Sequence, residues 1–70
     1  MMIHEYIKPE LDYFREVCNF SKDELTYFNC KAKKCTNREV AIKLNVSEPT
    51  VALIAKRVKD KINRAKAFKH

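Results

Sequence analysis

The chain has 70 residues with no glycine, two prolines and three cysteines, and its formal net charge is +6 at pH 7. A chain of this length forms one domain with a small core, which excludes a second folded unit and argues against an enclosed active site. The scarcity of glycine and proline favours helices joined by short polar turns, so we expect an all-α protein.

The first predicted helix covers residues 9–19. Pro9 suits a first helical turn, because the amides there have no acceptor within the helix. Apolar side chains then recur at intervals of three and four residues and define one inward face: Leu11, Phe14, Val17 and Cys18. The spacing therefore predicts an amphipathic helix.

A second helix is predicted over residues 22–34. Ser21 and Glu24 have the spacing of a capping box, in which each side chain accepts a hydrogen bond from the other residue's backbone amide. The expected inward face consists of Leu25, Phe28 and Ala32. The helix is expected to end in a lysine cluster made of Lys31, Lys33 and Lys34.

Two further helices are predicted over residues 37–44 and 48–64. The inward face of the first is marked by Val40 and Leu44. The inward face of the second is marked by Val51, Ile54, Ala55, Val58 and Ile62. Residues 65–70 are basic and weakly periodic, so the last helix either continues through them or frays.

Capping residues mark both ends of the turn between these two helices. Thr36 and Glu39 form a capping box at the start of the third helix. Asn45 tolerates the left-handed backbone in the turn, and Ser47 offers a side-chain oxygen that caps the fourth helix. The pattern is helix, tight turn, helix, and the second helix of such a motif enters the DNA major groove.

The charges are unevenly divided along the chain. Residues 1–29 carry three basic and six acidic groups, a net charge of −3, whereas residues 30–70 carry twelve basic and three acidic groups, a net charge of +9. The predicted motif lies in the basic part. A polyanion is the natural partner of such a surface, because phosphate contacts release counterions. The alternative is a solvated, lysine-rich surface with no partner.

Cysteine and histidine positions bear on cofactors and catalysis. The three cysteines form no Cys-x-x-Cys pair, and the two histidines lie near the chain ends, so we expect no metal and no cofactor. The cysteines then act as small apolar residues in a reduced, cytoplasmic protein.

The sequence has no nucleophile and base at plausible spacing and no glycine-rich phosphate loop, so we expect no enzyme. No apolar run approaches the roughly 18 residues that span a membrane.

Residues 20–63 resemble the DNA-binding domain of LuxR-type regulators and, equally, the fourth region of sigma factors. Phe20 and Ser21 precede the helix before the motif, residues 36–41 (TNREVA) match the first motif helix, and residues 46–51 (VSEPTV) lead into the recognition helix. The resemblance implies a four-helix, helix-turn-helix domain that binds double-stranded DNA. It implies a transcriptional regulator whose last helix reads the major groove.

The sequence departs from these families at several positions. Lys34 and Asn45 stand where glycine is usual. LuxR-type domains continue into a further helix that often forms a dimer, whereas this sequence stops at His70 and has its extra helix at the N-terminus. That order favours the sigma-like arrangement. The regions with which sigma factors bind core polymerase have no counterpart here, so we do not expect a complete sigma factor.

The DNA-binding residues that we predict lie around the motif's turn and on the recognition helix. They are Lys34, Arg38, Ser47, Glu48, Thr50, Leu53, Lys56 and Arg57. Glu48 is a candidate acceptor for cytosine, Arg57 for guanine contact and Lys56 for phosphate. Ala52 and Leu53 replace polar residues and offer only contacts to thymine methyl groups. Each polar residue also has a structural interpretation, as a helix cap or a solvated charge.

Two further interpretations remain open at this point. The chain is alternatively an adaptor or decoy, whose Leu53 and acidic first half bind RNA polymerase or another regulator. We also predict a homodimer formed through Ile3, Tyr6, Ile7 and Tyr13, because a small module makes few base contacts and two half-sites remedy this. The alternative is that these apolar residues close one end of the monomer core.

Overall fold

The computed structural model describes residues 3–68, which form one short 3-10 helix and four α-helices. The elements in chain order are η1 (Ile3–Glu5), α1 (Lys8–Val17), α2 (Lys22–Ala32), α3 (Asn37–Leu44) and α4 (Glu48–Phe68). Residues 3–68 include no β-strand. The prediction of an all-α, four-helix fold is therefore confirmed.

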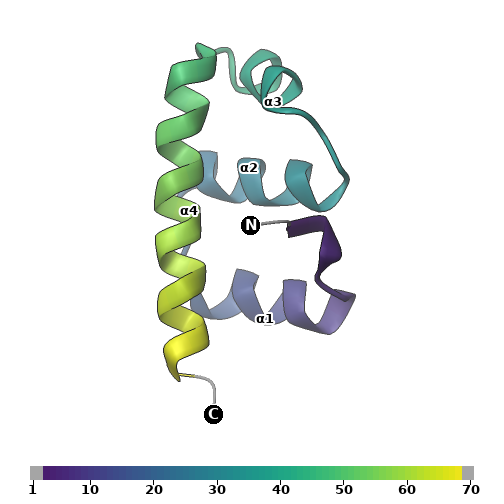
Figure 1. The fold of residues 1–70 in the computed structure, drawn as a ribbon, viewed down its shortest axis with the longest axis vertical. Coiled ribbons are helices and arrows are strands. Elements are labelled where there is room, and N and C mark those ends of the chain that lie inside the picture. The colour runs from purple at the N-terminus through teal and green to yellow at the C-terminus, as the bar shows by residue number, and fades with distance from the viewer. Residues whose placement is uncertain (1–2, 69–70) are drawn as a thin grey trace.

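Helix α4 is the longest element and runs along the long axis of the molecule (Figure 1). Its 21 residues correspond to about 31 Å of helix, within an overall Cα extent of 37 × 19 × 18 Å. Helices α1, α2 and α3 lie one above another along one side of α4, and all three contact it. The opposite side of α4 carries no other element of the described chain.

The core lies between α4 and the three shorter helices. Its fully buried large side chains are Phe28, Val40, Val51, Val58 and Ile62. Burial of one such side chain contributes about 1.5–3 kcal/mol, so this small group supplies much of the stability of the domain. The predicted inward face of the last helix is confirmed, with Ala55 only partly buried.

Helix α4 continues to Phe68, four residues beyond the predicted end. The buried side chains Val58, Ile62 and Ala65 follow helical spacing, so the apolar stripe extends past residue 64. The ammonium of Lys66 lies 5.1 Å from the centre of the Tyr6 ring, which ties the last turns to the N-terminal segment. These tertiary contacts favour continuation of the helix over fraying.

Helix α1 ends at Val17, two residues before the predicted end. Asn19 has a left-handed backbone with φ of 51°, which terminates the helix and turns the chain toward α2. Phe14 and Cys18 are buried and Leu11 is partly buried, as predicted. Val17 was predicted to lie on the inward face, but this prediction is wrong, since its side chain is 47% exposed. Val17 is the last residue of α1 and lines the groove between α1 and α4.

Helix α2 ends at Ala32 rather than residue 34, and its buried face differs from the predicted one. Phe28 is fully buried, but Leu25 is 37% exposed. The buried residues of α2 are Glu24, Tyr27, Phe28 and Cys30. The helix contacts α4, α3 and η1, so it needs a wide buried arc, and this arc is turned away from Leu25.

The N-terminal segment closes one end of the monomer core. Ile3 is only 3% exposed, and the ring of Tyr6 lies 5.0 Å from the ring of Phe14. Two of the residues that we assigned to a dimer contact are thus packed within the monomer, which matches the alternative interpretation. Ile7, in contrast, is 64% exposed.

None of the helices within residues 3–68 combines the length and the apolar character that crossing a bilayer requires.

Candidate nucleic-acid interface

Helices α3 and α4 form a helix-turn-helix unit with a three-residue turn, residues 45–47. Asn45 has the predicted left-handed backbone, with φ of 58°. The amide of Val46 donates to the carbonyl of Ala41 at 3.0 Å, and the amide of Asn45 donates to that of Ile42 at 3.2 Å. This pair of bonds is the Schellman pattern, which satisfies the last carbonyls of α3 and reverses the chain.

Ser47 caps α4 as predicted. Its hydroxyl oxygen accepts a hydrogen bond from the amide of Thr50 at 3.4 Å and lies 2.9 Å from the hydroxyl of Thr50. Both side chains are therefore engaged at the start of the helix. Thr36 and Glu39 likewise form the predicted capping box at the start of α3, as do Ser21 and Glu24 at the start of α2.

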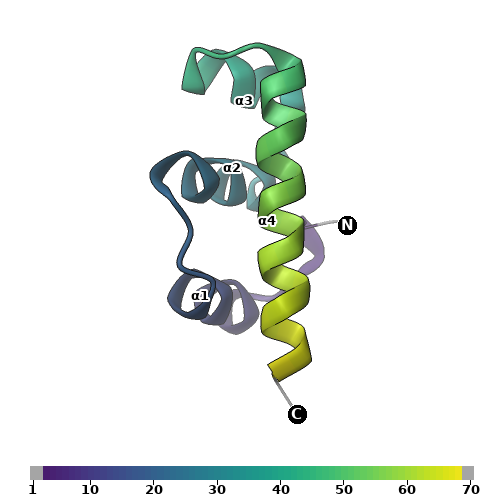
Figure 2. The same cartoon turned by 90° about the vertical axis from the view of Figure 1, so that its left-hand side faces the viewer.

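Helix α3 lies across the N-terminal end of α4 rather than along it (Figure 2). Val40 and Ala41 of α3 and Val51 of α4 are buried in the same apolar core. The small side chain of Ala41 permits the crossing. The steep crossing and the short turn are the geometry of a helix-turn-helix unit.

The outward face of the N-terminal half of α4 brings together Leu53, Lys56 and Arg57. At 100° per residue these three fall within about a third of the helix circumference, opposite the buried Val51 and Val58. Leu53 is 61% exposed, and Lys56 and Arg57 are exposed as well. A polar contact surface with one apolar side chain results.

The remaining candidates lie at the margins of this face. Glu48 is exposed in the first turn of α4, whereas Thr50 is only partly exposed. Arg38 is exposed in the first turn of α3, and Lys34 is exposed in the connection before it. The predicted set thus divides into a group on α4 and a group at the entry to α3.

Lys34 has an unusual backbone for a lysine. Its φ is 67°, in the left-handed region, which costs a residue with a Cβ about 1 kcal/mol. The amide of Lys34 donates to the carbonyl of Lys31, and the amide of Cys35 donates to that of Cys30, both at 3.0 Å. The turn between α2 and α3 therefore repeats the Schellman pattern of the motif's own turn. Glycine, which has no Cβ, adopts this backbone conformation without that cost.

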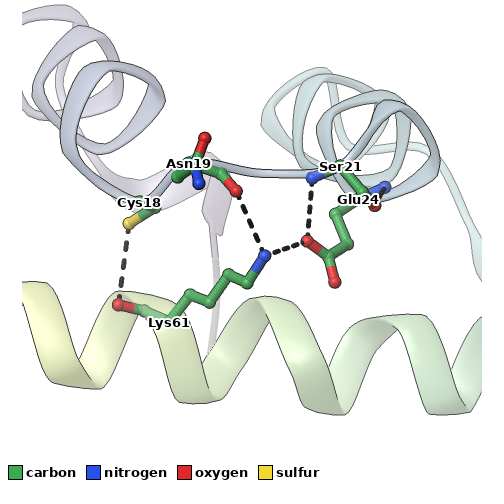
Figure 3. Close-up of polar contacts among 5 residues, drawn as sticks. All are labelled: Cys18, Asn19, Ser21, Glu24 and Lys61. Carbon is green, nitrogen blue, oxygen red and sulfur yellow. Dashed lines mark hydrogen bonds and ion pairs between the residues drawn. The ribbon is translucent and has the colours of Figure 1, made fainter.

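Lys61, for which we made no prediction, anchors α4 to the turn between α1 and α2 (Figure 3). Its ammonium donates to Glu24 Oε1 at 2.5 Å and to the carbonyl of Asn19 at 3.2 Å. The same Glu24 oxygen accepts from the amide of Ser21 at 2.9 Å. One carboxylate therefore caps α2 and holds α4. Helical spacing could have indicated this residue, since it places Lys61 next to the buried apolar stripe of α4.

The environment of this anchor shifts two pKa values. Burial raises the pKa of Glu24, but the hydrogen bonds from Lys61 and Ser21 outweigh burial, and the pKa is lowered overall. Burial raises the pKa of the Cys18 thiol, although the nearby Lys61 opposes this. The Cys18 thiol donates to the carbonyl of Lys61 at 3.6 Å. The same turn of α4 is thus held by two polar contacts, which fix its orientation relative to α1 and α2.

The cysteines and acidic residues of the described chain do not form a metal site. Within residues 3–68, no group of three or more histidine, cysteine, aspartate or glutamate side chains is placed to hold an ion. Cys18 and Cys30 are buried thiols, and Cys35 is partly buried. The burial of Cys18 and Cys30 agrees with the interpretation of the cysteines as small apolar residues. His70 lies outside the described residues.

No protein-family model, curated protein or solved structure matches the chain.

Proposed function

We propose that the chain binds double-stranded DNA and regulates transcription, with the N-terminal half of α4 in the major groove. The observation that carries this proposal is the outward face of α4 formed by Leu53, Lys56 and Arg57. That face follows a three-residue turn from α3, and no described element covers it. It belongs to residues 30–70, whose net charge is +9. A major groove about 12 Å wide admits a helix in this way.

The chemistry of the α4 face suggests how contacts are divided. Arg57 reads guanine through two hydrogen bonds, and Lys56 contacts phosphate. Leu53 cannot donate a hydrogen bond, so it packs against thymine methyl groups. Glu48 accepts from cytosine. The hydroxyls of Ser47 and Thr50 are 2.9 Å apart in the cap, and this engagement limits their share of the base contacts.

The position of α1 supports the sigma-like arrangement over the LuxR-like one. The extra helix precedes the motif and packs against the C-terminal half of α4. The proposal includes a reducing, cytoplasmic location, in which the three free cysteines remain thiols.

A second candidate function is an adaptor that binds RNA polymerase or another regulator. The observation that favours it is the exposure of two large apolar side chains on the motif helices, Ile42 at 72% and Leu53 at 61%. Exposed apolar surface is a feature of protein contacts where it forms a contiguous patch. The two functions predict different salt dependence.

Titration of a fluorescent duplex with the protein at several salt concentrations tests the proposal. We expect affinity to fall steeply as salt rises, because phosphate contacts dominate. A protein that is folded by circular dichroism but binds no duplex at low salt contradicts the proposal and favours the adaptor. Selection from random duplexes then defines the preferred sequence.

A further inference from the structure

We propose that a pocket beside the turn between α2 and α3 holds a phosphate of the DNA backbone, with Lys31 and Lys34 as its ligands. This inference rests on the proposed DNA-binding function. The pocket has a volume of about 420 Å³ and lies between η1, the end of α2 and the start of α3. Ile3 and Tyr27 form buried parts of its lining, and His4 also lines it.

The lining of this pocket is suited to an anion. Among the described residues, those lining it include two lysines and one histidine and no carboxylate. Of the acidic residues close in sequence to the lining, Glu5 is exposed beside His4, and Glu39 accepts a hydrogen bond from the amide of Thr36 at 3.0 Å. The charge of Glu39 is engaged mainly by the hydrogen bonds of the capping box of α3, and its interaction with Lys31 is weaker. Two cations without a carboxylate between them make a favourable environment for phosphate.

The pocket between α1 and α2 is also lined by three cations and no carboxylate, namely Lys8, Arg15 and Lys33, but Lys8 and Arg15 form ion pairs with Asp12. The pocket between α2 and α3 is lined by Lys33 and Lys43 but also by Glu39. The groove between α1 and α4 contains Lys61, whose charge is paired with Glu24, and it is partly apolar. The pocket beside the α2–α3 turn differs in that neither of its two lysines takes part in a salt bridge within the described residues.

The two lysines are held in place by different means. Lys31 is partly buried, and its ammonium lies 5.8 Å from the centre of the Tyr27 ring, so its side chain is ordered against the pocket wall. Lys34 is held by its backbone, which is left-handed and fixed by the Schellman bonds. The equivalent position after α3 is Asn45, a residue that suits this conformation. A lysine in the strained conformation is consistent with a role for its charge.

The position of the pocket identifies the source of the phosphate. The pocket adjoins Thr36 and Asn37 at the start of α3, the first helix of the motif. A duplex that places α4 in its major groove runs its backbone past the ends of the motif helices. The surrounding basic surface adds affinity for a polyanion, whereas a single free phosphate gains only from the two lysines. We therefore assign the pocket to the DNA backbone.

A pair of identical substitutions at adjacent positions tests the assignment. Lys34→Asn removes the charge from the pocket and keeps a residue that accepts the left-handed backbone. Lys33→Asn removes the same charge from a neighbour whose φ is an ordinary −95° and which lines the pocket between α2 and α3 and the pocket between α1 and α2. We expect Lys34→Asn to weaken duplex binding about tenfold at 0.1 M salt and to reduce the salt slope by about 1. We expect less than about a twofold change for Lys33→Asn.

Thermal unfolding of the same variants distinguishes a binding role from a structural one. We expect Lys34→Asn to raise the Tm by roughly 4 °C, because it relieves backbone strain. Stability and affinity would then change in opposite directions, which misfolding cannot produce. If Lys34→Asn and Lys33→Asn weaken binding equally, or if neither does, the pocket is not a phosphate site. If the wild-type protein binds no duplex at all, the proposed function fails and this assignment fails with it.

Thermal unfolding with added inorganic phosphate distinguishes a site for a free phosphate compound from a site for the DNA backbone. At constant ionic strength, about 10 mM phosphate should leave the Tm of the wild-type protein unchanged, since a ligand that binds raises it. A rise in Tm that Lys34→Asn abolishes, together with unchanged duplex binding by that variant, would assign the pocket to a free phosphate compound. That result would overturn the assignment to the DNA backbone.

Discussion

Lys61 and Glu24 connect the middle of α4 to the first turn of α2 by an ion pair, with 2.5 Å between Nζ and Oε1. The Glu24 side chain is nearly enclosed, with 7% of its surface exposed, whereas that of Lys61 is 32% exposed. The pair therefore differs from the surface pairs of Asp12, which lie on exposed side chains of α1. It fixes how far α4 turns about its own axis, and thereby which residues α4 presents on its outward face.

Loss of this pair should destabilise the protein. We expect Lys61→Met to lower the free energy of unfolding by about 1–3 kcal/mol, because it leaves a buried carboxylate with one partner fewer. Lys59→Met is the matched control, since Lys59 is an exposed lysine of the same helix and should change stability by less than about 0.5 kcal/mol. Urea titration followed by circular dichroism measures both. Equal stability of the two variants would mean that the pair contributes nothing.

Protonation of Glu24 should lower the free energy of unfolding in acid. The pKa of Glu24 is lowered in the folded protein from its ordinary value of 4.5, so the unfolded chain takes up a proton first. The stabilising contribution is therefore complete above about pH 4.5 and is lost as the pH falls below it through the folded value. We expect Glu24→Gln to flatten the profile of unfolding free energy between about pH 6 and pH 3. The pKa of Glu39 is lowered too, through its bonds with Thr36, so part of the slope should remain.

A wild-type profile that does not fall in this range would contradict the pH prediction. Glu16→Gln is a suitable control, because Glu16 is an exposed carboxylate on α1. We expect its profile to follow that of the wild-type protein. The comparison separates the buried, paired carboxylate from the general effect of removing one negative charge.

The starts of the helices could be predicted from the sequence more closely than their ends. Ser21, Thr36 and Ser47 cap α2, α3 and α4 at the predicted positions, because a cap depends on residues only three apart. Helix ends depend on left-handed residues, and Lys34 gives no local sign that it adopts this conformation. The last turns of α4 depend on contacts with Tyr6, which is distant in sequence.

The ion pair between Lys61 and Glu24 could not be predicted from neighbouring residues for the same reason. Glu24 was identified as a capping residue, which it is, but its second partner lies 37 residues away. The spacing of the apolar residues places Lys61 beside Ile62 without indicating what its ammonium contacts. The shared position of Leu53, Lys56 and Arg57 could be predicted from the sequence, since helical spacing alone places them on one face of one helix.

Arg57 and Lys56 should differ in their effect on DNA recognition. We expect Arg57→Ala to lower the preference for the best sequence over a scrambled one by about 1–3 kcal/mol, through loss of a base contact. We expect Lys56→Ala to weaken binding to both duplexes alike and to reduce the salt slope by about 1. Anisotropy titrations with the two duplexes measure these changes. If both variants lose affinity equally on both duplexes, Arg57 does not read a base.

The predicted homodimer now depends chiefly on Ile7. Ile3 is buried in the monomer, so removing the N-terminal segment would damage the core and could not serve as a test. Ile7 is 64% exposed at the start of α1, and its replacement by a charged residue leaves the core intact. We expect sedimentation equilibrium to show a dimer of the wild-type protein at tens of micromolar, roughly the range of a weak association. Ile7→Glu should shift it to monomer, whereas Ile42→Glu, at an exposed apolar residue of α3, should not. A wild-type protein that stays monomeric at this concentration contradicts the prediction and leaves the N-terminal segment with its packing role alone.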